Sequence, residues 1–275
     1  AGMSDERGSA IHRAAAQGYG AEADTYVTGR PDYPAAVTGW LAADLGLGPG
    51  RRVLDLGSGT GKFLPTLRTT GASVVAVEPV DAMRARIAGA HPEVEALTGT
   101  AEAIPLDSAS LDAVVCAQSF HWFATAAALT EIARVLRPGG RLGLIWNVRD
   151  ETVPWVAALS RITDPHEGGA PRYRTGAWRA PFPAPDFGPL RERHWRHAHS
   201  GTPEAVILDR TLSVSFIAAL PSAERARVAA AVRALIADTP ELAGRATLDF
   251  PYVTTAYSSV RAGRRRGRPT CSPAP

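Results

Sequence analysis

Short runs of apolar residues alternate with amphipathic segments along the middle of the chain. The runs that predict strands lie at residues 52–56, 73–77, 94–97, 111–117 and 141–146. Segments with helical spacing follow most of them, at residues 61–69, 80–89 and 124–136. This alternation is typical of a parallel sheet that is covered by helices on both faces.

The pattern differs on either side of this region. Two helices are predicted before it, at residues 11–23 and 34–47, the second with Pro34 in its first turn. Helices are predicted after it at residues 153–162, 203–212 and 223–238, and strands at residues 190–199 and 246–257. A long ordered loop rich in proline, glycine and aromatic residues follows the first of these helices. Because helices separate the late strands, those strands can add an antiparallel edge to the sheet.

Composition sets the broad class of protein. Hydrophobic residues make up 45% of the 275 residues and charged residues 21%, and no uninterrupted apolar run is as long as a membrane span. The first residues lack the apolar core of a signal peptide. The two cysteines, Cys116 in an apolar run and Cys271 in a polar tail, are a poor basis for a disulfide framework. We therefore expect a cytoplasmic protein with no membrane partner.

Arginine dominates the basic residues, but it is unevenly placed. Lys62 is the only lysine among the 30 basic residues, and five arginines follow Val260, where no acidic residue occurs. Subtracting these five from the formal net charge of +3 leaves −2 for residues 1–260. Because the main part of the chain is close to neutral, we expect no nucleic-acid partner and a solvated tail.

The stretch VLDLGSGTGKF, Val53 to Phe63, places glycines between a strand and a helix. A phosphate-binding P-loop is excluded, because Leu56 and Phe63 stand where that motif needs glycine and a hydroxyl residue. The dinucleotide fingerprint fails as well, because its third glycine would fall on Lys62 or on Leu64. The stretch does match the pattern Asp55-x-Gly57-x-Gly59-x-Gly61, with Glu78 closing the next strand.

This spacing suits an adenosine that is joined to an amino acid. Glycines let a ligand approach the backbone, and a helix N-terminus offers N–H groups to a carboxylate. Asp55 and the loop can address the amino-acid part, while Glu78 can accept hydrogen bonds from both ribose hydroxyls. Taken alone, Asp55 could be a helix cap and Glu78 a strand end. Their joint spacing favours the ligand.

Several motifs in order resemble those of class I S-adenosylmethionine (SAM)-dependent methyltransferases (methyltransferase type 11), and among them small-molecule enzymes similar to trans-aconitate methyltransferase. The resemblance covers about residues 19–146 and rests on YVTGRPDYP, VLDLGSGTGKF, VVAVEPVDAM, GTAEAIPL, LDAVVCAQSFHWF and LRPGGRL. The cofactor-binding residues that it implies are Tyr26, Arg30, Asp55, Gly57, Ser58, Gly59, Gly61, Glu78, Met83, Thr100, Ala101, Glu102 and Gln118. Many relatives carry Asp where Thr100 stands, which weakens the expected bond to adenine.

His121 is the candidate catalytic residue, because it follows the fourth strand at the edge where such sheets bind ligands. It could be a general base with a pKa near neutrality, a donor that orients a substrate carboxylate, or a structural residue. The expected substrate-pocket residues are Phe120, Trp122, Trp146, Asn147, Arg149, Trp155, Tyr173 and Trp178. Arg149 could pair with a substrate carboxylate. His194, His197 and His199 are expected on one face of a strand, without partners for a metal site.

These features predict methyl transfer from SAM to a small organic molecule, such as a natural product or a carboxylate-bearing metabolite of secondary metabolism, with S-adenosylhomocysteine as the other product. Ala117-Gln118-Ser119-Phe120 stands where enzymes that methylate base amines carry Asp/Asn-Pro-Pro-Tyr. Three alternatives stay open: cyclisation or rearrangement chemistry with SAM, a non-catalytic SAM-binding module, and an NAD-dependent enzyme. The protein is expected to be a monomer or a homodimer without a metal.

The predicted fold is α/β, a Rossmann-like doubly wound seven-stranded sheet with an N-terminal helical lid and a helical insertion before the last strand. Residues 1–50 would form the lid and residues 51–260 the methyltransferase domain. Within that domain, residues 147–245 would form the insertion that shapes the substrate pocket. Residues 261–275 are expected to be a disordered basic tail.

Overall fold

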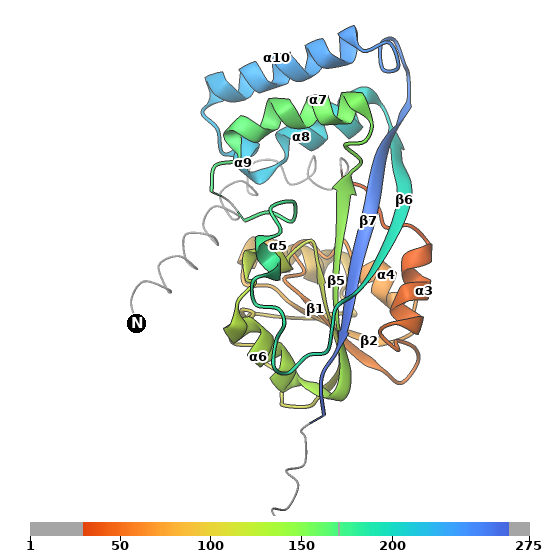
Figure 1. Cartoon of the computed structure of the whole chain (residues 1–275), viewed down its shortest axis with the longest axis vertical. Helices are drawn as coiled ribbons and strands as arrows, with labels where there is room; N and C mark the ends of the chain where they lie inside the picture. The colour runs from red at the N-terminus through yellow and green to blue at the C-terminus, as the bar shows by residue number, and fades with distance from the viewer. Residues whose placement is uncertain (1–29, 170, 264–275) are drawn as a thin grey trace, which may run out of the picture.

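The computed structural model describes residues 30–169 and 171–263. They form one seven-stranded sheet with the strand order β3-β2-β1-β4-β5-β7-β6, which confirms the predicted fold class. Figure 1 shows two tiers, the sheet with its flanking helices and a layer of helices over the far ends of β5, β6 and β7. The helix predicted at residues 11–23, Tyr26 and most of the basic tail lie outside the described residues.

The first five strands are parallel. They are β1 (Arg52–Leu56), β2 (Ser73–Val77), β3 (Glu95–Leu97), β4 (Leu111–Ala117) and β5 (Leu136–Arg149). The chain builds outward from β1 in one direction and from β4 in the other, so the topology switches between these two strands. In doubly wound sheets, ligands bind at the carboxyl ends of the strands beside such a switch point.

Two strands complete the sheet on the β5 side. β7 (Leu248–Val260) runs antiparallel to β5, and β6 (Arg191–Gly201) runs antiparallel to β7, as the late strand pattern predicted. β5 extends three residues beyond its predicted end because its ladder with β7 continues to the pair Arg149 and Tyr252. The apolar run that defined the prediction stops at Trp146, where side-chain burial becomes partial.

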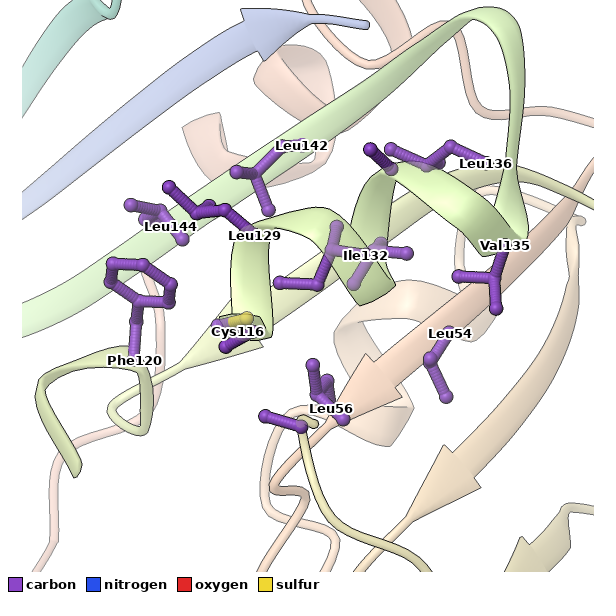
Figure 2. Close-up of a cluster of buried hydrophobic side chains, with 14 of the residues drawn as sticks. Leu54, Leu56, Cys116, Phe120, Leu129, Ile132, Val135, Leu136, Leu142 and Leu144 are labelled. Atoms are coloured by element: carbon purple, nitrogen blue, oxygen red, sulfur yellow. The ribbon is translucent and has the colours of Figure 1, made fainter. Parts of the chain in front are cut away.

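Helices cover both faces of the parallel part. On one face lie α3 (Ala36–Ala43), α4 (Leu64–Arg68) and α5 (Asp81–Ala90), whose apolar residues pack with Val53 of β1. On the other face α6 (Ala126–Val135) packs Leu129 and Ile132 against Leu54 of the same strand. Figure 2 shows this second core, in which Cys116 is a buried apolar contact. α4 begins later than predicted because Pro65 occupies its first turn.

The segment between β5 and β7 builds a third core. Its helices are α7 (Pro154–Thr163), η4 (Glu204–Asp209), α8 (Arg210–Leu212), α9 (Ser215–Ala218) and α10 (Ser222–Asp238). They bury Leu159, Ile207 and Val232 against Phe250 and Tyr252, which lie on the protruding end of β7. None of the helices in the described part of the chain combines the length and hydropathy needed to cross a bilayer.

The predicted long loop connects α7 to β6 and includes two short 3₁₀ helices, η2 (Asp164–His166) and η3 (Ala177–Arg179). Its aromatic residues pack onto the face of β5 that α6 also covers. Trp178 and Tyr173 each lie with their rings 4.8 Å from the ring of Trp146. The described part of the loop, residues 164–169 and 171–190, is therefore ordered, because its aromatic side chains supply a core of their own.

Candidate functional site

The glycine loop leaves β1 in a conformation that favours glycine. Gly57, Gly59 and Gly61 have φ angles of 69°, 56° and 84°, in the left-handed region. The backbone N–H groups of Gly57 and Ser58 both donate to the carbonyl oxygen of Val77, at 2.9 Å and 3.3 Å. The loop is thereby bound to the end of β2, and its open side is at Gly59, where an added Cβ would meet only Met83, at 4.0 Å.

Glu78 follows β2 and is held by this loop. Its carboxylate accepts the N–H of Gly59 on Oε2 at 2.8 Å and the N–H of Val80 on Oε1 at 2.9 Å. The side chain is buried, with 5% of its surface exposed. These two bonds orient the Glu78 carboxylate, which as an ionised group can only accept hydrogen bonds.

Asp55 is the most unusual polar residue of the site. It lies at the end of β1 with no exposed surface, and neither of its carboxylate oxygens has a hydrogen-bond partner. Burial and the negative charge of Glu78 raise the pKa of Asp55 to about 8. An unpaired buried carboxylate is unfavourable, so this position suits a ligand that brings a cation or hydrogen-bond donors.

The other predicted cofactor residues lie around the loop and the end of β3. Met83 is nearly buried, and its Sδ faces Gly59. The backbone N–H of Glu78 donates to Leu97 at 3.1 Å, which brings the segment after β3 beside it. In that segment Ala101 is buried in the core, Thr100 is half-buried and Glu102 is exposed. Arg30 is half-buried at the start of the described chain.

The chain turns sharply after β4. Gln118 has a φ of 59°, which is uncommon for a residue other than glycine, and its backbone N–H donates to Ile145. The Ser119 hydroxyl then donates to the carbonyl oxygen of Leu56 at 2.8 Å, beside the glycine loop. This turn places the short 3₁₀ helix η1 (Phe120–Trp122), and with it His121, next to the loop.

The protonation state of His121 follows from its partner. The indole Nε1–H of Trp146 donates to Nδ1 of His121 at 3.0 Å. Because an indole N–H can only donate, Nδ1 carries no proton and the neutral imidazole has its proton on Nε2. Burial and the positive charge of Arg172 lower the pKa of His121 to about 3, so the alternative of a general base with a pKa near neutrality is wrong. His121 is neutral at physiological pH and presents an N–H donor.

Comparison with known proteins agrees with this geometry. The family described as "Methyltransferase domain" matches residues 54–144. An uncharacterized methyltransferase of Mycobacterium tuberculosis strain H37Rv is 41% identical over 244 residues, which cover 89% of this chain and 96% of that protein. The chain belongs to the class I SAM-dependent methyltransferases. An uncharacterized methyltransferase-like protein of Schizosaccharomyces pombe is 37% identical over 86% of this methyltransferase and 92% of the yeast protein.

Solved structures show the same fold. A protein from Anaeromyxobacter dehalogenans, whose structure is provisionally described as that of a type II methyltransferase, is 28% identical to this methyltransferase. The two structures align with a TM-score of 0.55, over 86% of this methyltransferase and 97% of that chain. One from Anabaena variabilis has a TM-score of 0.57 at 19% identity, over 84% and 98% of the two chains. The second likeness shows the fold alone.

The predicted pocket residues of the methyltransferase separate into groups. Phe120, Trp146 and Trp178 are buried in the core on the α6 face, so they support the site from behind. Trp122 and Tyr173 are half-buried at its margin. Trp155 is not brought together with them, because it begins α7 and packs edge-on against Phe250 in the third core, with ring centroids 5.0 Å apart.

Asn147 lies on the opposite face of β5 from Trp146, and its side chain is hydrogen-bonded to neighbouring strands. Its Oδ1 accepts the Thr254 hydroxyl at 2.5 Å and lies 3.2 Å from Nε2 of His197. His194 contacts Thr255, the next residue of β7, at 3.2 Å. His194 and His197 therefore lie on opposite faces of β6, and the expectation of a shared face is wrong because their positions differ by an odd number.

Lys62, whose surroundings do not match a phosphate-binding P-loop, forms an ion pair within the protein. Its Nζ lies 2.7 Å from Oδ1 of Asp32, at the start of the described chain. The backbone carbonyl of Asp32 also accepts the side-chain N–H of Asn147, at 3.4 Å. These contacts hold the segment before α3 against the glycine loop.

Sequence reasoning did not single out Arg172 or Arg210, whose charges act near the candidate site. The guanidinium of Arg172 lies 5.8 Å from the ring of Trp122, and its charge acts on His121. Arg149, which was predicted, lies deeper: it is 3.5 Å from the Thr211 hydroxyl and 5.8 Å from the ring of Phe250. Burial and Arg210 lower the pKa of Arg149 to about 10.

Substitutions of the glycines should separate folding from binding. A Cβ at Gly57 would lie 2.9 Å from the Cβ of Ser119, whereas a Cβ at Gly59 would meet only Met83, at 4.0 Å. Gly57→Ala should therefore lower the melting temperature more than Gly59→Ala. Both variants suffer backbone strain, and the contact with Ser119 destabilises Gly57→Ala by about 1–3 kcal/mol more. Gly59→Ala should fold but bind SAM at least ~10-fold more weakly, as measured by calorimetry.

Gly139→Ala is the matched control for backbone strain. Gly139 has a φ of 79°, and a Cβ there would meet no atom within 4 Å. This variant should show the strain in its melting temperature and keep wild-type affinity for SAM. If Gly59→Ala and Gly139→Ala bind SAM equally well, the open side of the loop is not the cofactor site.

Proposed function

We propose that this methyltransferase transfers a methyl group from SAM to a small organic molecule that carries a carboxylate. The observation that carries the proposal is the buried, unpaired Asp55 beside the glycine loop and Glu78. Asp55 suits a ligand group that is cationic or donates hydrogen bonds, and Glu78 is an oriented acceptor at the end of the adjacent strand. An amino acid joined to a ribose has the complementary groups.

The residues of the chain fit SAM as follows. Asp55 would hold the amino group, and the glycine loop would approach the methionine part with its backbone. Glu78, oriented by Gly59 and Val80, would accept the ribose hydroxyls. Met83 and the segment from Thr100 to Glu102 would lie along the adenine. When bound, SAM supplies an electrophilic methyl group on a positively charged sulfur.

His121 would orient the substrate. Its Nε2–H is a donor, and its Nδ1 is occupied by Trp146, so it is unsuited to removing a proton. A carboxylate or another anionic nucleophile needs no base. Positioning alone can supply about 7–11 kcal/mol of barrier reduction when two reactants are held in line. The inserted helices and the loop that contains Tyr173 would enclose the substrate and exclude water.

The test is binding followed by turnover. Calorimetric titration should give micromolar dissociation constants for SAM and S-adenosylhomocysteine and no binding of NAD. Incubation with SAM and a set of organic acids should then release S-adenosylhomocysteine together with a methylated acid, detected by mass spectrometry. Binding of NAD in place of SAM would exclude the proposal. A SAM-derived product other than S-adenosylhomocysteine would indicate cyclisation of SAM, and an isomerised acid with SAM unchanged would indicate rearrangement. Binding of SAM without any turnover would indicate a sensor.

A further inference from the structure

Two arginines beside the site have buried N–H groups without acceptors. Nε and Nη2 of Arg172, and Nε and Nη1 of Arg210, are buried and form no hydrogen bond. Each unpaired buried donor costs about 1–3 kcal/mol. Native proteins pair nearly all such groups, so a cluster of them in one region indicates a missing partner.

Arg172 lies close to the candidate catalytic histidine, and Arg210 acts electrostatically on Arg172. Arg172 stands over the ring of Phe216 at 4.4 Å and reaches Trp122, the residue after His121, at 5.8 Å. Its charge lowers the pKa of His121, and the charge of Arg210 lowers the pKa of Arg172. Arg172 is therefore within reach of a ligand that contacts His121, and Arg210 adds a second positive charge that acts on Arg172.

The acidic residues of this region are held by other partners. Arg174 forms ion pairs with Glu167 and, at 3.3 Å, with Asp164. Glu151 accepts the hydroxyl of Ser160 at 2.5 Å. Among the described residues, no carboxylate forms a hydrogen bond with the four buried N–H groups of Arg172 and Arg210.

The unpaired atoms of Arg172 identify the class of ligand. Nε and Nη2 lie on the same edge of the guanidinium, with parallel N–H bonds that match the two oxygens of a carboxylate. We propose that Arg172, with Arg210 beside it, binds a carboxylate of the substrate that is not the methyl acceptor. This rests on the proposed function. A carboxylate held by both oxygens is a poor nucleophile, so the substrate needs a second group to receive the methyl.

The site would then have opposite charges at its two ends. Asp55 and Glu78 are acidic and lie where the cationic SAM would bind, whereas Arg172 and Arg210 are basic and lie on the substrate side. The substrate predicted by this arrangement is an organic acid with a separate nucleophilic oxygen, nitrogen or carbon. Aliphatic dicarboxylic acids and hydroxybenzoic acids both meet this description.

The experiment measures binding of glutarate and of 4-hydroxybenzoate to the full chain by calorimetry, each beside its uncharged amide. At least one acid should bind and its amide should not. Arg172→Met should weaken binding of that acid at least ~10-fold, as expected for a charged hydrogen-bonded pair. Arg227→Met is the matched control, because the Arg227 side chain is 74% exposed. It should bind like the wild type.

The melting temperature of Arg172→Met shows whether weaker binding of the acid comes from a folding defect. Because its N–H groups lack acceptors, Arg172→Met should leave the melting temperature of the ligand-free protein unchanged or raise it. A lower melting temperature, equal binding by Arg172→Met, equal binding of acid and amide, or no binding of either acid would overturn the proposal. Failure of the proposed function is distinguishable, because SAM would not bind while the acids can still be titrated into ligand-free protein.

Discussion

Asp55→Asn should make the ligand-free protein several kcal/mol more stable at pH 8, measured by urea unfolding across pH. The folded state raises the pKa of Asp55 from 3.8 to about 8, so between these values the folded protein binds a proton that the unfolded chain releases. Wild-type stability therefore falls as pH rises through this window, by about 1.4 kcal/mol per unit. The variant lacks this loss, so the two proteins should converge near pH 4.

Asp112→Asn is the control with the opposite sign. Hydrogen bonds from Arg52 and Arg51 and the charge of Arg137 lower the pKa of Asp112, so its contribution is present at neutral pH and is lost on acidification. This variant should be less stable than the wild type at pH 7 and approach it in acid. A parallel pH dependence for wild type and Asp55→Asn would show that folding does not raise the pKa of Asp55.

Glu78→Gln should weaken SAM and S-adenosylhomocysteine binding by about 10- to 100-fold, because a hydrogen bond to a charged group contributes about 1.5–3 kcal/mol. The substituted amide can also accept only one of the N–H groups of Gly59 and Val80 that orient the carboxylate. Calorimetry measures the affinities, and circular dichroism verifies that the variant is folded.

Glu95→Gln provides the comparison for Glu78. Glu95 lies on β3 with a largely exposed side chain, 3.9 Å from Arg52, and should bind both ligands as the wild type does. If Glu78→Gln keeps its affinity within about threefold of the wild type, the ribose is held by another residue. The cofactor assignment would then need a different acceptor at the end of β2.

The parts of the site that could be predicted are local in sequence. Asp55, Gly57, Gly59 and Gly61 lie within seven residues, and their spacing is what lets the backbone turn beside the end of β2. Glu78 follows the next strand, so parallel pairing brings it to the same edge. The fold was predictable for the same reason, because strand and helix periodicity are properties of short segments.

The parts that could not be predicted depend on packing between distant segments. Nothing in the local pattern distinguishes Arg172 from the other 28 arginines, because the burial of its N–H groups depends on how the loop after α7 meets α9. Trp155 is aromatic and close in sequence to Trp146, but the chain turns away into the third core between them. The low pKa of His121 likewise depends on burial and on the charge of Arg172, which is remote in sequence.

The long ladder between β5 and β7 has a consequence for the order of folding. The ladder runs from the pair Arg141 and Val260 to the pair Arg149 and Tyr252, so closing it joins residues that are 103 to 119 positions apart. The parallel strands contact neighbours that are much nearer in sequence and can assemble first. Until β7 arrives, β5 is an unprotected edge, and the third core lacks Phe250 and Tyr252. We therefore expect the inserted helices to be completed together with the sheet, late in folding.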